Sequence, residues 1–103
     1  MAANTLVITA SITEAQALRF TPAGLPALNL VLDHRSEAEE AGVKRQVTTS
    51  LKAMAFGAVA ERLARQAIGS HWQFEGFLAN AARSKSVVLH IQNFSQDFLP
   101  DLI

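Results

Sequence analysis

Hydrophobic and polar residues alternate along several stretches of this chain, at the period of a β-strand. In residues 4–13, Leu6, Ile8 and Ile12 fall on one face, and mostly threonine and serine fall on the other. Because successive side chains of a strand point to opposite faces, this pattern predicts a strand with one face on a core. The same period predicts further strands at residues 27–35, 43–53, 71–79 and 87–94, with a short extended piece at residues 17–20.

The predicted strand at residues 43–53 has a distinct polar face. Val47 and Leu51 are expected to point toward the core. The opposite face then carries a row of polar side chains, which are Lys44, Gln46, Thr48, Ser50 and Lys52. A row of this kind on an outer strand face is available to a ligand, although such residues are also common as solvated edge protection.

The period changes to that of a helix at residues 56–69. Val59, Leu63 and Ala67 recur at intervals of four residues, which places them on one helical face. Gly69 is well suited to end the helix, because glycine readily adopts the left-handed backbone of a helix C-terminus. The pattern therefore predicts one helix of about three turns, close to the usual length.

The connections between these elements differ in character. Proline and glycine at residues 22–26 predict a turn. Residues 36–42 are predicted to form a long charged loop, and residues 80–86 a short basic one. The tail, residues 95–103, is expected to be irregular, outside a core at residues 4–94.

The order of three strands, one helix and two strands predicts the fold class. It is the order of the OB-fold, a five-stranded Greek-key barrel, so we expect an all-β protein with one short helix. The alternative is an open sheet with one helix packed on it. A chain of 103 residues suits a single domain spanning residues 1–103.

Composition restricts the possible functions. The chain has no cysteine, which excludes disulfides, thiol catalysis and Cys-ligated zinc. The N-terminal stretch lacks the basic and apolar blocks of a signal peptide or membrane span, and we expect a cytoplasmic protein that does not contact the membrane. Nine basic and nine acidic residues give no net charge, which argues mildly against nucleic-acid binding but does not exclude a basic face.

The chain offers little catalytic chemistry. His34, His71 and His90 fall on three different predicted strands, with no spacing typical of a metal site. The glycines are isolated, and no nucleophile motif is present. We therefore expect a binding domain, not an enzyme, with no catalytic residue, metal or cofactor.

The binding surface predicted on this fold is cationic. On an OB barrel, oligonucleotides lie on one strand face and between two loops, and phosphates are neutralised by cations while exposed rings stack on bases. Phe77 is expected to point outward, opposite Trp72 and Phe74, although it could instead lie in the core or a protein contact. The candidate residues are Arg35, Lys44, Arg45, Thr48, Lys52, Phe77, Arg83 and Lys85.

Several stretches resemble the primosomal replication protein N (PriB) family, relatives of single-stranded-DNA-binding proteins. These are "TPAGLPALNLVLDHRSEAEEAG", "FEGFLA" and "VVLHIQNF", within a likeness that extends from Leu6 to Phe94. The resemblance implies a non-catalytic homodimer of OB-folds in the bacterial cytoplasm, associated with the nucleoid. It also implies binding to single-stranded DNA, to a PriA-type restart helicase and to other primosome proteins in replication restart.

The resemblance also implies roles for individual residues. Arg35 and Arg45 match basic family positions, and Arg83 and Lys85 fall in a loop where relatives carry DNA-contacting lysines. Thr48 stands where some relatives place a stacking tryptophan, and Val43 where an aromatic residue is expected. We therefore expect weak DNA binding, since each missing base–aromatic stack removes about 1–3 kcal/mol.

Two alternatives remain at this point. One is a general single-stranded-DNA-binding protein, although the short tail lacks the long acidic extension typical of that group. The other is a protein–protein adaptor whose barrel does not touch nucleic acid. For the partners, we expect Glu37, Glu39 and Glu40 to face a basic protein surface, and the edge at residues 4–13 to pair in the dimer.

Overall fold

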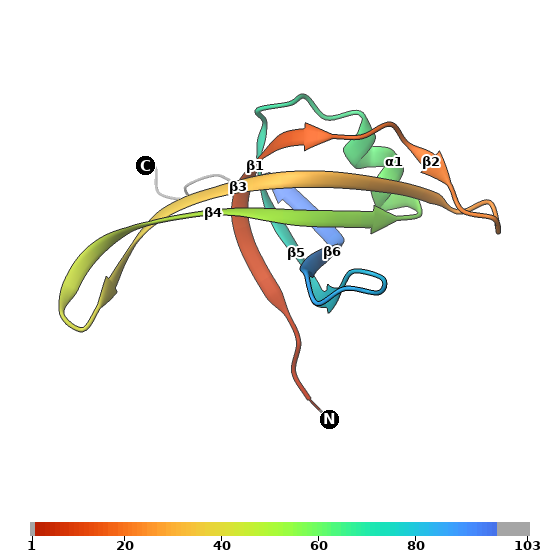
Figure 1. Ribbon diagram of the computed structural model, residues 1–103. Coiled ribbons are helices and arrows are strands. Elements are labelled where there is room, and N and C mark those ends of the chain that lie inside the picture. Colours follow the sequence, from red (N-terminus) through yellow and green to blue (C-terminus); the bar gives the residue numbers. More distant parts are fainter. Residues whose placement is uncertain (1, 97–103) are drawn as a thin grey trace.

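The computed structural model describes residues 2–96, which form strands around a single short helix (Figure 1). The elements follow one another in the predicted order. They are β1 (Leu6–Ala15), β2 (Arg19–Phe20), β3 (Pro26–Glu40), β4 (Val43–Phe56), α1 (Ala58–Ala64), β5 (His71–Asn80) and β6 (Val87–Gln96). β2 is the short extended piece expected at residues 17–20, and it pairs only with β3.

The sheet closes on itself. Its order is β1-β5-β6-β4-β3-β2, and a further pairing joins β1 to β3, so five long strands form a ring. All pairs are antiparallel except β4 with β6, whose register matches Ala53 with Leu89. This closed five-stranded barrel confirms the OB-fold and excludes the open sheet.

The barrel interior is filled by the inward face of each strand. Val47 was expected to point toward the core, but it stands opposite Ser36 on β3 and is not part of the core. Phe74 and Leu89 are 0% exposed, and Leu28 and Leu32 are each 1% exposed. Leu63 of α1 is buried with them and closes one end of the barrel. Burying a leucine or phenylalanine contributes about 1.5–3 kcal/mol, so this core stabilises the positions of the outer strand faces.

The prediction of a charged loop at residues 36–42 is wrong. β3 and β4 continue their antiparallel pairing out to Glu40 opposite Val43, and they form a long two-stranded arm. In Figure 1 this arm extends far from the barrel, on the side opposite α1. Its turn consists of Ala41 (φ 53°) and Gly42 (φ 79°), and positive φ at both central residues is typical of a tight hairpin. The β4 half of this arm falls within the strand predicted at residues 43–53, but its β3 half, residues 36–40, was not predicted. No core lies against residues 36–40, so both of their faces are polar and carry no clear alternation.

The helix is shorter than predicted. α1 comprises seven residues, and the backbone leaves the helix at Arg65. Gly69 does not end the helix but lies beyond it, with φ 94°. Its N–H donates to the carbonyl oxygen of Ile12 at 2.7 Å, and this contact with β1 requires the chain to leave the helix early. Arg65 donates from Nε to the main-chain oxygen of Glu61 at 3.3 Å.

The last strand extends beyond its predicted end at Phe94, since β6 includes Ser95 and Gln96. The predicted irregular tail otherwise lies outside the described residues. Among residues 2–96, no helix is long and apolar enough to cross a membrane.

Candidate functional site

A groove lies on the outer face of β3 and β4. Its cavity volume is ≈ 410 Å³. It lies between the end of β1 on one side and the start of the loop between β5 and β6 on the other. The residues that line it are Glu14, Gln16, Asn29, Leu30, Val31, Lys52, Ala53, Met54, Ala81, Ala82 and Val88.

The strand registers explain which side chains reach this groove. Lys52 stands opposite Val31, and Met54 stands opposite Asn29. These residues share the outer face, because Ala53 and Leu30 between them are buried in the core. Lys52 is therefore the cation on the β4 side of the groove, as the polar face predicted for residues 43–53 implied.

The other polar residues of β4 follow the same face away from the groove. Thr48 and Lys44 alternate outward toward the tip of the arm, and Arg35 stands opposite Thr48. The Arg35 side chain is 80% exposed and its Nε lies 3.6 Å from Asp33 Oδ2. This part of the predicted site therefore forms a line along the arm and does not surround the groove.

Arg45 lies on the opposite face of the arm from Lys44 and Thr48, since strand neighbours alternate. Its Nη1 lies 2.6 Å from Glu40 Oε1. An exposed pair of this kind contributes at most about 1 kcal/mol, but it neutralises the charge that a phosphate would meet.

The acids and bases of the arm are interleaved. Glu39 stands opposite Lys44, and Glu37 stands opposite Gln46. Gln46 Nε2 donates to Glu37 Oε2 at 3.4 Å. Acidic and basic side chains of the arm are therefore neighbours across its two strands.

The loop between β5 and β6 carries the next two candidates. Ala81 and Ser86 close it through a main-chain hydrogen bond of 2.9 Å. Arg83 adopts φ 57°, a left-handed conformation that is uncommon for a residue with a side chain. Arg83 and Lys85 follow the alanines that line the groove, and neither forms an ion pair within residues 2–96.

Phe77 points outward, as predicted, but its ring is half-buried because it packs on His90. The two ring centroids are 4.9 Å apart, with an interplanar angle of 10°. His90 in turn stacks on Phe56 at 6.1 Å. This row crosses β5, β6 and β4 beside a second hollow of ≈ 330 Å³, and Met54 lines both hollows. Phe77 therefore lies outside the groove but on a surface continuous with it.

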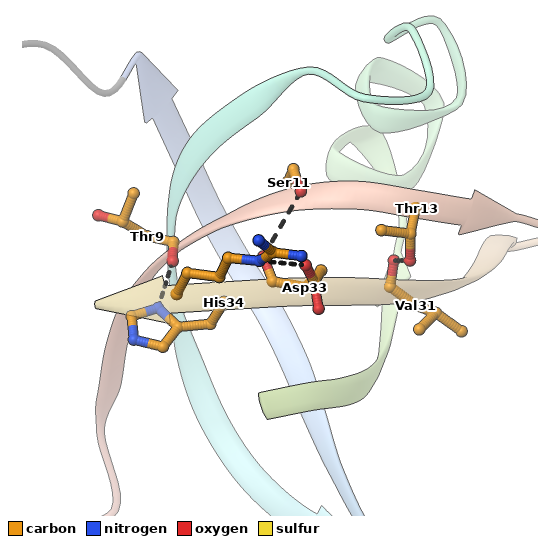
Figure 2. A network of polar contacts seen from close by, with 7 residues as sticks. Thr9, Ser11, Thr13, Val31, Asp33 and His34 are labelled. Atoms are coloured by element: carbon orange, nitrogen blue, oxygen red, sulfur yellow. Dashed lines mark hydrogen bonds and ion pairs between the residues drawn. The ribbon is translucent and has the colours of Figure 1, made fainter. Parts of the chain in front are cut away.

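A network of polar contacts holds β1 against β3 where the arm leaves the barrel (Figure 2). The Nδ1 atom of His34 lies 2.6 Å from the carbonyl oxygen of Thr9, and its Nε2 lies 2.8 Å from Ser36 Oγ. Thr13 Oγ1 also donates to the carbonyl oxygen of Val31 at 3.1 Å. These contacts occupy both ring nitrogens of His34, and within the described residues no group of three potential ligands could hold a metal ion.

Sequence reasoning missed several residues of the groove. Met54 lies just beyond the predicted end of its strand, and Asn29 falls within the strand predicted at residues 27–35 but is not among the candidate residues. Glu14 lies near the end of β1, after the register shift between Ile12 and Glu14, and Gln16 follows the strand. Alternation could have identified Asn29, because Leu28 and Leu30 on either side of it are buried. It could not have identified Glu14, because a residue inserted into a strand leaves no trace in a simple alternation.

Comparison with known proteins gives consistent results. Residues 4–93 match a protein family described as "Another single-strand binding protein family". The replication restart protein PriB of Bordetella pertussis is 48% identical over 90 residues, which cover 86% of this chain and 84% of that protein. The solved structure of PriB from Ralstonia solanacearum is 36% identical and has a TM-score of 0.85, covering 94% of this chain and 100% of the other. The SSB domain of a Synechococcus protein has the same fold at 21% identity, with a TM-score of 0.70 over 91% of this chain and 96% of that domain.

Proposed function

Because the chain belongs to the PriB family of replication restart proteins, we propose that it binds single-stranded DNA as a non-catalytic member of the replication restart primosome. The observation that carries this proposal is the position of the groove. It lies on the strand face and between the loops where OB-folds bind oligonucleotides. The groove also combines an apolar floor with a cation, the two requirements for bases and phosphates.

Each part of the groove has a role in this proposal. Lys52 on the β4 side of the groove, with Arg83 and Lys85 on the neighbouring loop, would neutralise phosphates along the strand. Bases would pack on Met54 and Val31, which supply apolar contact without an aromatic ring. DNA binding by this chain is therefore weak, since stacking on an aromatic ring contributes about 1–3 kcal/mol per base.

The arm has a second role in this proposal. Arg35, Lys44 and Thr48 extend the outer face beyond the groove, so a longer DNA strand could follow them. Arg45 is neutralised by Glu40, and the acids Glu37, Glu39 and Glu40 are exposed. We therefore assign the acids of the arm to a basic surface of the restart helicase, a PriA-type protein, which this chain recruits or stimulates.

The quaternary state proposed is a homodimer formed through β1. This strand pairs with β5 from Leu6 to Ser11, but with β3 only from Ser11 onward. One edge of its first half is therefore unpaired within residues 2–96, and such an edge readily pairs with a second copy. The remaining proposals follow the family. They are one domain over residues 1–103, and a bacterial cytoplasmic, nucleoid-associated location.

A salt-dependent titration tests the function. Fluorescence polarisation of a labelled single-stranded oligonucleotide is expected to show binding that weakens as salt rises, because phosphate contacts release counterions. Absence of binding at low salt would favour the protein–protein adaptor instead. Binding independent of salt would contradict a phosphate-led mode.

A further inference from the structure

β1 contains a β-bulge at the edge of the groove. Ile12 stands opposite Leu32 on β3, whereas Glu14 stands opposite Val31, so Thr13 is an additional residue in the strand. Without it, Glu14 would stand opposite Leu30, which is buried. A bulge of this kind re-aims the next side chain, and here it turns Glu14 onto the outer face.

The bulge brings Glu14 into line with Lys52. Val31 stands opposite Glu14 on one side and opposite Lys52 on the other. The three side chains thus lie next to one another across three strands, with Val31 in the middle, and all three line the groove. Neither Glu14 nor Lys52 forms an ion pair within the described part of the chain.

The two walls of the groove therefore differ chemically. The β4 wall carries the ammonium group of Lys52, and the basic loop with Arg83 and Lys85 follows it. The β1 wall carries the carboxylate of Glu14 and the side-chain amide of Gln16. Gln16 is held there by its main-chain N–H, which donates to the carbonyl oxygen of Asn29 at 3.0 Å. A phosphate is attracted to the first wall and repelled by the second.

We propose that Glu14 fixes the orientation of the bound strand and selects bases that carry an amino group. This inference rests on the proposed function. The DNA backbone lies toward Lys52 and the basic loop, and the bases lie toward β1. A carboxylate only accepts hydrogen bonds, so Glu14 accepts from the exocyclic amino group of cytosine, which thymine lacks.

The test compares labelled oligo(dC) and oligo(dT) of equal length by fluorescence polarisation at low salt. The native chain is expected to bind oligo(dC) about five-fold more tightly, the lower end of discrimination by a side chain that reads one base. Glu14→Gln retains the shape but adds an N–H group that can donate to a carbonyl oxygen of thymine, so the two oligonucleotides are expected to bind equally. Glu75→Gln is the matched control, since Glu75 is exposed on β5 opposite Val7 and does not line the groove.

Equal binding of the two oligonucleotides by the native chain would overturn this inference. An unchanged preference for oligo(dC) in Glu14→Gln would also overturn it. The same holds if the preference disappears equally in Glu75→Gln, because the preference would then depend on net charge. Failure of the native chain to bind either oligonucleotide would instead contradict the proposed function itself.

Discussion

Gly76 on β5 lies so close to His90 on β6 that no other residue fits. A Cβ atom added to Gly76 would lie 1.8 Å from the main-chain oxygen of His90. The register explains the approach, because Gly76 stands opposite Ile91 and Glu75 stands opposite Asn93, so Gln92 is an additional residue in β6. This second bulge also determines where His90 lies against Phe77.

Gly76→Ala is expected to destabilise the barrel. The obstructing atom is backbone, so the two strands must separate, and overpacking of this kind costs about 1–3 kcal/mol or more. Urea unfolding followed by the fluorescence of Trp72 measures the free energy of unfolding. Gly24→Ala is the control, because its Cβ would meet nothing within 4 Å and only its φ of 85° is strained. Equal destabilisation in the two variants would contradict the steric explanation.

Removal of the cations around the groove is expected to weaken DNA binding without changing stability. Two variants test this: the single variant Lys52→Ala, and the double variant Arg83→Ala with Lys85→Ala. Each leaves phosphates of the bound strand without a neutralising partner. The slope of log K against log salt should fall by about 0.7 for each phosphate of a single strand that is no longer neutralised. Arg65→Ala is the control, because Arg65 lies after α1 and lines a hollow on another part of the surface.

Polarisation titrations at several salt concentrations measure both affinity and slope for these variants. If Lys52→Ala binds with the native slope while Arg65→Ala does not, DNA follows a different surface and the groove is the wrong site.

The five long strands could be predicted from the sequence because each has one face in the core. Leu28, Leu30 and Leu32 are buried as the alternation indicates. The β3 half of the arm could not be predicted in the same way, since residues such as Glu37 pair with β4 while both of their faces meet solvent. Pairing of that kind depends on a partner strand and not on burial.

The candidate site could be predicted only where its residues follow the simple alternation of a strand. Lys52 follows from simple alternation on β4, and it does line the groove. Glu14 also lines the groove, but alternation does not predict it, because one additional residue in β1 reverses the face of every residue after it. Arg45 was grouped with Arg35 because both match basic family positions, but alternation on the paired arm places the two on opposite faces.

Reversal of the arm acids is expected to impair helicase binding more than DNA binding. The triple variant Glu37→Lys, Glu39→Lys and Glu40→Lys replaces the acids of the arm with cations and breaks the pair of Glu40 with Arg45. Placing like charges against a basic partner should weaken that complex about ten-fold or more. DNA affinity should stay level or rise.

Binding to the purified restart helicase and to an oligonucleotide is compared for this variant and for Glu61→Lys with Glu75→Lys, which reverses acids elsewhere on the surface. A larger decrease in DNA binding than in helicase binding would refute the assignment of the acids.

The free edge of β1 is expected to hold the dimer together through main-chain hydrogen bonds. The carbonyl oxygen of Thr9 accepts from His34 on the β3 side, so it points away from β5. Val7, two residues earlier in the same strand, points its N–H in the same direction. Val7→Pro therefore removes a donor at the free edge while leaving the pairing of β1 with β5 in place.

Sedimentation at micromolar concentration should show a dimer for the native chain and a monomer for Val7→Pro. Val7→Thr is the control, since it retains the N–H and a residue favoured in strands. Circular dichroism must show that Val7→Pro is folded, because only a folded monomer separates a disrupted interface from an unfolded barrel. A folded Val7→Pro dimer, or a native monomer, would mean that β1 does not form the interface.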